Sequence, residues 1–485
     1  MIKKIKGLLF ENKNARQTVA KNTFWLSVSQ IGSRFIRAAI MIYAARILGA
    51  EQYGVFSYAL SLAGFFTVFA DAGISAIMTR EASRKSDQRS EYFSTAFWIK
   101  CGMLVVSAGL LVFVAPYFSK IQAANALLPL IAILTIMDGL RDFGVSFFRA
   151  LEKMELEALV TTLTNLAIAV FGFVILAYST TAGALATSYV ASSALGTLAA
   201  IFILKEEFIK VVSHFRRELV KPLIFAIGPL AIFNLLGVFM LNTDTVIIGL
   251  LLDAKNIGYY AVAQRVIQIF YAFPGVLASA MFPAMARAVH DGNDTKSRLL
   301  AEYGMVAVMA MALPMVVGGI ILGQPIMALL YGQEYIPATL TFQILMVTLL
   351  ILFPGLVLSN YNIAYNAQKK IVVAFLLGAI GNVAFDFLLI PRWGIAGSAI
   401  ATLIAQTLNF GYIWIVMKKV NYFEIGSYFK KIIPATLIMA LASYFMNLFG
   451  VNVIINIVIS AALYGGILYI LREKLLFEMR AAIRG

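Results

Sequence analysis

Long apolar stretches recur along the whole chain, separated by short polar segments rich in Gly, Pro, Ser and Asn. Each stretch is close to the roughly 20 residues that a helix needs to cross about 30 Å of hydrocarbon. The intervening residues are typical of turns. The pattern therefore predicts an all-α membrane protein of about fourteen transmembrane helices. The predicted spans lie near residues 23–45, 53–79, 92–114, 125–148, 158–178, 183–204, 222–250, 257–283, 302–323, 339–362, 371–390, 395–417, 432–448 and 452–471.

The composition agrees with this pattern and excludes several classes of protein. Of the 485 residues, 61% are hydrophobic and 13% charged, whereas soluble domains carry about 25% charged residues. One cysteine, Cys101, excludes a disulfide framework, and the two histidines lie in polar stretches. The chain has no P-loop, HExxH or GxSxG motif. We therefore expect no enzyme, no catalytic residues, no cofactor and no metal site.

The distribution of positive charge predicts how the chain lies in the membrane. Thirty of the 39 Lys and Arg residues lie in segments on one side of the predicted spans, four lie on the other side and five lie within spans. Cytoplasmic loops of membrane proteins carry such an excess. The imbalance predicts a multi-pass protein of the cell (inner or plasma) membrane with both termini cytoplasmic. It also explains the net charge of +15 without nucleic acid as a partner.

An internal repeat predicts two lobes. Residues 48–59 (LGAEQYGVFSYA) and 252–263 (LDAKNIGYYAVA) agree at four positions, and AGALAT from Ala182 is echoed by AGSAIAT from Ala396. Both pairs occupy matching places in two blocks of six spans. Blocks with an even number of spans insert in parallel and form two pseudo-symmetric lobes around a central site. The predicted division is an N-lobe at 1–204, a cytoplasmic linker at 205–221, a C-lobe at 222–417, and two further helices with the C-terminus at 418–485.

Several positive charges fall inside the predicted spans, where they are costly and usually functional. Gln30, Arg34 and Arg37 share one face of the first span because they are four and three residues apart. Arg265 lies in the eighth span, near Gln268. Guanidinium groups suit phosphate oxygens, so charges from both lobes are expected to converge on one anion-binding pocket. The alternative is that these arginines pair with resident acids, for example Arg265 with Asp244.

The intramembrane acids and amides leave more than one interpretation open. Asp138, Arg141 and Asp142 in the fourth span favour an internal salt-bridge cluster. The acids Asp71, Asp244 and Asp386 are candidates for ion coupling, with capping or pairing as the structural alternative. Asn360 heads a group of three asparagines at the inner end of the tenth span, where a sugar hydroxyl or a structural partner would fit equally well. Asp71, Asp244, Asp386 and Asn360 thus complete the set of candidate site residues.

Residues 22–84 resemble the N-terminal region of the oligosaccharide/polysaccharide flippases, which belong to the multidrug/oligosaccharidyl-lipid/polysaccharide superfamily. The likeness is carried by ARILGAEQYGVFSYA, by DAGI at Asp71–Ile74 and by Arg80-Glu81. It continues in NTDTVIIG, in LYGQEY at Leu330–Tyr335 and in WGIAGSAIAT at Trp393–Thr402, and so extends over essentially the whole chain. The individual motifs are loose, but their order and spacing are specific.

The resemblance implies a function as well as a fold. It implies alternating access by two lobes, polyprenyl-diphosphate-linked oligosaccharide as the substrate in the membrane lipid, and a cationic cavity for the diphosphate. Arg34, Arg37 and Arg265 match that cavity. Glycosyltransferases or a polymerase would be its partners. A lipid II flippase is the nearest alternative, followed by a multidrug/cation antiporter, which the basic cavity and two extra spans disfavour; a membrane scaffold without transport is a further rival.

Overall fold

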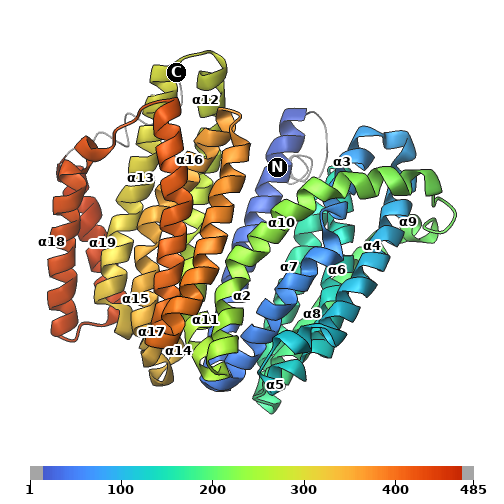
Figure 1. The fold of residues 1–485 in the computed structure, drawn as a ribbon, viewed down its shortest axis with the longest axis horizontal. Coiled ribbons are helices and arrows are strands. Elements are labelled where there is room, and N and C mark those ends of the chain that lie inside the picture. Colours follow the sequence, from blue (N-terminus) through green and yellow to red (C-terminus); the bar gives the residue numbers. More distant parts are fainter. Residues whose placement is uncertain (1–14, 472–485) are drawn as a thin grey trace, which may run out of the picture. The chain divides into compact units, whose positions relative to one another are not determined.

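The computed structural model describes residues 15–471, and every regular element within this range is a helix. The all-helical architecture predicted from the sequence is therefore confirmed. The chain divides into two compact units, residues 1–258 and 259–485. Figure 1 follows these units along the chain, the first from blue to green and the second from green to red.

Unit 1 contains the predicted spans one to seven. Its longer helices are α2 (Ala15–Asp71), α3 (Ile74–Arg84), α4 (Arg89–Phe113), α6 (Leu128–Ala150), α7 (Met154–Tyr178), α8 (Ala182–Ile203) and α10 (Arg217–Leu251). Short helices, α5 (Gln122–Asn125) and α9 (Lys205–Ile209), lie in the connections. Helix α2 packs mainly on α7, and α6 packs mainly on α8, so these four helices carry the interior of the unit.

Helix α2 contains the first predicted span and most of the second. Gly49 joins the two parts with φ 70° and ψ 172°, a conformation that glycine adopts without steric cost. A second break follows Asp71, where Ala72 has φ 45° and Gly73 has φ 104°. The Asp71 carboxylate stabilises this break because its Oδ1 accepts hydrogen bonds from the backbone N and the Oγ of Ser75, the latter at 2.7 Å.

Unit 2 contains the remaining predicted spans. Its helices are α11 (Ala254–Phe270), whose first residues belong to unit 1, α12 (Ala272–His290), α13 (Asp294–Ile321), α14 (Gly323–Tyr331), α15 (Thr339–Val347), α16 (Leu349–Ala364), α17 (Gln368–Val420), α18 (Phe429–Leu448) and α19 (Val453–Ile470). Helix α17 again joins two predicted spans, at Gly394 with φ 56°. The two double helices are therefore bent at glycines with positive φ, at the positions where the sequence predicted hairpins.

Eleven stretches of the described residues are long and apolar enough to cross a membrane. Two of them, Lys21–Arg84 and Gln368–Val420, each contain two of the predicted spans. Helix α6 is not among the eleven because charged residues interrupt its apolar sequence. Every predicted span thus coincides with helical structure, and the total of about fourteen spans stays a prediction.

The compact units do not coincide with the predicted linker at 205–221. Helix α10 follows this segment and contacts α2, α3 and α4, so it belongs to unit 1, which ends at Gly258. The predicted lobes were defined by the repeat and not by packing. Their boundaries therefore stay a prediction.

The matching residues of the repeat contact one another within unit 1. A Cβ atom added at Gly54 would lie 1.7 Å from the carbonyl oxygen of Ala254, and one added at Gly258 would lie 1.9 Å from that of Ala50. Ala50 and Gly54 are the counterparts of Ala254 and Gly258 in the repeat. Small residues four apart let membrane helices approach at backbone distance. The reciprocal contact is what a duplicated hairpin would produce.

An aromatic core holds α6 in place within unit 1. The Phe93 ring on α4 lies 5.2 Å from the Phe143 ring and 4.5 Å from the Phe147 ring, both on α6. All three side chains are fully buried. Aromatic pairs at such distances add to the stabilisation from buried area. This core fixes the inner half of α6, next to the charged residues described below.

Candidate functional site

The predicted anion-binding residues of α2 lie as the sequence indicated, on one face of a helix. Gln30, Arg34 and Arg37 are all exposed. The Nε of Arg37 donates a hydrogen bond of 2.5 Å to Oδ1 of Asn165 on α7. Among the residues that the structure describes, Arg34 forms no ion pair. Within residues 15–471, neither guanidinium is therefore neutralised by a directly bonded carboxylate.

Asn165 fixes the position of Arg37. Its side chain is 1% exposed, and its Nδ2 donates to Ser33 Oγ at 3.0 Å and to the Thr161 carbonyl at 2.6 Å. The remaining amide oxygen accepts from Arg37. A neutral amide orients the guanidinium without cancelling its charge, so Arg37 keeps its capacity to attract an anion.

A charged cluster on α6 lies close to this group. Arg141 contacts Asp138 at 2.5 Å and Asp142 at 2.8 Å, which confirms the predicted salt-bridge cluster. Ser193 on α8 donates to Asp138. Helix α6 also packs against α2, which carries Arg37.

Both carboxylates of the α6 cluster reach a surface of unit 1. The side chains of Asp138 and Asp142 are 40% and 62% exposed, while that of Arg141 is 11% exposed. Gly196 on α8 makes room beside them, because a Cβ there would lie 3.1 Å from Cδ of Arg141 and 2.1 Å from Oγ1 of Thr164. Arg141 is thus paired with two carboxylates, and its cluster carries one net negative charge in a region that is costly for charge.

The inner end of the same helix pair is different. Lys21 on α2 is buried and forms a 2.9 Å ion pair with Glu155 on α7. The cation there is neutralised by a carboxylate, whereas Arg37 contacts an amide. The contrast marks the middle of the first predicted span as a place where unit 1 keeps positive charge available.

Asp71 has a structural function that the sequence left open. Besides Ser75, its Oδ1 accepts from the buried Lys100 Nζ at 3.0 Å. The carboxylate thus caps the start of α3 and pairs with α4. A role for Asp71 in ion coupling stays a prediction.

The predicted site residues of unit 2 are more scattered. Arg265 is exposed, and its Nη1 lies 3.5 Å from Oε1 of Gln268 one turn later. Asn360 is half-buried. Its neighbour Asn362 is fully buried, and its Nδ2 lies 3.3 Å from the Met417 sulfur. The predicted convergence of Arg265 with the arginines of unit 1 stays a prediction.

The two other candidates for ion coupling are buried. Asp244 on α10 is 3% exposed, and Asp386 on α17 is 0% exposed. Both interact with neighbouring groups. Within residues 15–471 there is no group of three His, Cys, Asp or Glu side chains placed to hold a metal ion. An ion-coupling role for these two acids stays a prediction.

Sequence reasoning missed the neutral partners of the charged residues. Asn165, Ser33 and Ser193 have no special spacing in the sequence, and Gly196 lies in a helix rich in small residues. A polar residue on an otherwise apolar span is a weak signal, because Ser and Asn also bond their own helix. Their role follows only from the packing of α2 on α7 and of α6 on α8.

Comparison with known families gives two matches. Residues 19–289 match the family described as polysaccharide biosynthesis protein. Residues 229–388 match the MatE family. The first match includes all the candidate residues of unit 1, and also Arg265 and Gln268.

Similar curated proteins come from archaea and bacteria. A probable flippase, AglR of Haloferax volcanii, is 24% identical over 395 residues, which are 79% of each chain. A putative O-antigen transporter of Shigella flexneri is 21% identical over 81% of this chain and 96% of its own. A succinoglycan biosynthesis transport protein, ExoT of Rhizobium meliloti, is 25% identical over 66% of this chain and 64% of its own.

Solved structures share the fold. The lipid II flippase MurJ in an inward closed conformation has a TM-score of 0.76 and 18% identity, and covers 93% of this chain and 99% of its own. An inward-facing multidrug resistance MATE family transporter of the MOP superfamily has a TM-score of 0.67 and 13% identity, over 82% and 98%. At sequence identities this low, the structural similarity shows that this chain shares their fold, and it shows no more than that.

Proposed function

The chain belongs to the polysaccharide biosynthesis protein family, and we propose that it is a flippase for polyprenyl-diphosphate-linked oligosaccharides. It is a multi-pass membrane protein and a transporter, not an enzyme. It moves the sugar-diphosphate headgroup from the cytoplasmic to the outer leaflet by alternating access, for the synthesis of a cell-surface polysaccharide. The plasma membrane is its location, with both termini in the cytoplasm.

One observation supports this proposal most strongly. Arg37 is oriented by a buried amide, and Arg34 is exposed on the same face one turn away. Two guanidinium groups on one helical face match the oxygens of a diphosphate, because each can form two parallel hydrogen bonds to phosphate. The cost of two charges in a span is offset when an anion binds them. Gln30, Arg265, Gln268 and Asn360 are the proposed further contacts to the headgroup.

The driving force is a separate part of the proposal. Asp244 is the acid that we would test first for ion coupling, since it is buried in a span and such residues are often functional. Asp386 is the second candidate. Asp71 is the third, because Lys100 and Ser75 already bind its carboxylate. Glycosyltransferases and a polymerase are the proposed partners that supply and consume the substrate.

Reconstitution in lipid vesicles tests the proposal. The purified chain is placed in vesicles that contain a radiolabelled polyprenyl-diphosphate disaccharide, and transport is followed as the growing fraction of label that an external glycosidase can release. Transport by the wild type, and its loss in Arg37→Ala and Arg34→Ala, is the expected result. Full activity of both variants would reject the proposed site.

Two rival substrates serve as further arms of the experiment. Faster movement of lipid II than of the disaccharide lipid would identify a lipid II flippase. Uptake of a cationic dye that depends on Asp244 would identify a multidrug or cation antiporter. Protein that inserts correctly but moves none of the three would favour a scaffold without transport.

A further inference from the structure

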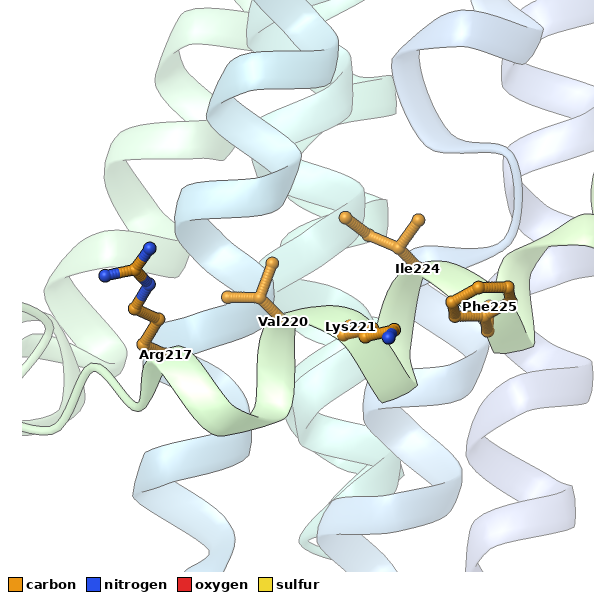
Figure 2. Close-up of a pocket in the computed structure, with 5 residues that line it drawn as sticks. All are labelled: Arg217, Val220, Lys221, Ile224 and Phe225. Atoms are coloured by element: carbon orange, nitrogen blue, oxygen red, sulfur yellow. The ribbon is translucent and has the colours of Figure 1, made fainter.

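An exposed groove lies at the start of α10, outside the site described above. It has a volume of about 290 Å³ and is lined by Arg217, Val220, Lys221, Ile224 and Phe225. Figure 2 shows the five side chains on successive turns of the helix, with the Arg217 guanidinium at one end and the Phe225 ring at the other. The residues recur at intervals of three and four, so they share one face.

The length of α10 places this groove at the edge of the membrane. The helix has 35 residues, or about 52 Å at 1.5 Å per residue. Crossing the hydrocarbon takes about 20 residues. The first turns of α10 therefore extend beyond the hydrocarbon, on the side predicted to be cytoplasmic.

The opposite face of the same turns is fixed to unit 1. Leu223 and Ile227 are buried in its hydrophobic core. The backbone N of Arg216 donates to Thr95 Oγ1 at 3.0 Å, and its guanidinium pairs with Glu91 at 2.9 Å. The groove face must consequently point away from the helical core of the unit.

The groove combines positive charge with apolar surface. Ile224 and Phe225 are 52% and 73% exposed. Arg217 and Lys221 are exposed one turn apart, and neither forms an ion pair among the described residues. The Lys221 Nζ lies 5.9 Å from the centre of the Phe225 ring. Glu218 is exposed beside them but lies about 100° from Arg217 around the helix.

Such a surface suits an anionic lipid. Helices that lie in the membrane interface carry Lys and Arg beside exposed Phe, Leu or Ile. A phosphate fits the fork of an arginine and a neighbouring lysine. Water would solvate the two cations equally well, but it would not cover the apolar side chains between them.

We propose that this groove binds an anionic phospholipid of the cytoplasmic leaflet. Arg217 and Lys221 hold its phosphate, and Val220, Ile224 and Phe225 contact the upper part of an acyl chain. The bound lipid anchors the segment that connects α8 with α10. The proposal does not depend on which substrate the protein transports.

Binding of two phospholipids to the purified full-length chain tests the proposal. The delipidated protein is titrated with phosphatidylglycerol and with phosphatidylcholine of the same acyl chains, and bound lipid is counted by native mass spectrometry. Each basic residue near an anionic surface favours binding by about fivefold. We expect phosphatidylglycerol to bind at least ~10-fold more tightly than phosphatidylcholine to the wild type.

The double variant Arg217→Gln, Lys221→Gln should reduce this preference to about twofold. The charge-conserving variant Arg217→Lys, Lys221→Arg should keep most of the preference for phosphatidylglycerol. It tests the role of the two charges even if the double glutamine variant fails to fold. Lys369→Gln with Lys370→Gln is the matched control, because these two lysines lie in another predicted cytoplasmic segment. It should leave the preference unchanged.

Three results would overturn the proposal. The first is equal binding of the two lipids to the wild type. The second is an undiminished preference in the double glutamine variant. The third concerns competition by an equal amount of polyprenyl diphosphate. If this lipid displaces phosphatidylglycerol from the wild type but not from the double glutamine variant, the groove belongs to the transported lipid.

Discussion

The two units place their intramembrane polar groups differently. In unit 1 the charged residues reach a surface, as the 40% and 62% exposure of Asp138 and Asp142 shows. In unit 2 uncharged amides are packed between helices: Asn362, Asn409 and Asn456 are all 0% exposed. Buried polar groups in a membrane protein mainly join helices, whereas exposed charges usually contact a ligand or an aqueous cavity. The difference is confined to these groups: the α6 carboxylates of unit 1 reach a surface, and the three amides of unit 2 join helices, while Asp386 of unit 2 and Asp244 of unit 1 are buried acids.

The Asn456 contacts illustrate the packing in unit 2. Its Nδ2 donates to the Ser443 carbonyl at 2.9 Å, and its Oδ1 accepts from Ser443 at 2.9 Å and from Ser460 at 3.0 Å. The amide links α18 to α19, and its carbonyl oxygen and one amide N–H are hydrogen-bonded. Asn165 in unit 1 is equally buried, yet one of its bonds goes to an exposed arginine. Asn456 thus joins two helices, whereas Asn165 also orients an arginine side chain.

The largest effect is expected from Arg37→Ala and Arg34→Ala. Hydrogen bonds to a charged group contribute about 1.5–3 kcal/mol, so each variant should slow transport by roughly 10- to 100-fold. Thermal unfolding should change little in Arg34→Ala, whose side chain is exposed, whereas Arg37→Ala also removes the hydrogen bond to the buried Asn165 Oδ1 and should destabilise the protein by about 1–3 kcal/mol. The vesicle assay measures the transport rate, and the melting temperature of the same preparations measures the stability. If a variant were unstable but transported at the wild-type rate per folded molecule, the two arginines would serve stability and not transport.

The next largest effect is expected at the helix crossing of unit 1. Gly54→Leu or Gly258→Leu would place atoms within 2 Å of the opposite backbone, so the helices must separate. Overpacking of this kind costs about 1–3 kcal/mol or more, which thermal unfolding in detergent would detect. Gly102→Leu is the matched control, since nothing lies within 4 Å of a Cβ there. Equal stability of all three variants would contradict the close contact.

A smaller effect, confined to stability, is expected from Asn456→Leu. Hydrogen bonds between membrane helices average about 0.6 kcal/mol, so the loss of the two bonds to Ser443 on α18 should destabilise the pair α18 and α19 by about 1 kcal/mol. Transport per folded molecule should stay unchanged, because these helices lie outside the predicted repeat. The measurement is a melting curve beside the vesicle assay. Loss of transport at unchanged stability would show that unit 2 carries more of the chemistry than proposed.

The smallest effect is expected from Arg80→Ala. Its ion pair with Glu81 is 2.9 Å long, but the arginine is 57% exposed. Exposed pairs contribute at most about 1 kcal/mol. Transport and melting temperature should both stay near the wild type, which makes this variant the control for Arg34 and Arg37. A transport defect as large as theirs would mean that any lost positive charge impairs the protein.

The sequence predicted the helical stretches well because span length and apolar pattern are local properties. It also placed Gln30, Arg34 and Arg37 on one face, and it paired Arg141 with Asp138 and Asp142. It placed turns between the spans that Gly49 and Gly394 separate, and both glycines have non-helical backbone angles. The partners Asn165 and Ser193 were missed because their contacts depend on how α2 meets α7 and how α6 meets α8.

The most direct test of the central claim is the binding of three lipids that share one polyprenyl chain and carry two, one or no phosphate groups. Polyprenyl diphosphate, polyprenyl monophosphate and neutral polyprenol of equal length are titrated into the wild type and into Arg37→Ala in detergent. We predict that the wild type binds the diphosphate at least ~10-fold more tightly than the polyprenol, and that the variant loses this preference. An equal preference in both proteins would contradict the assignment of Arg37 to the diphosphate.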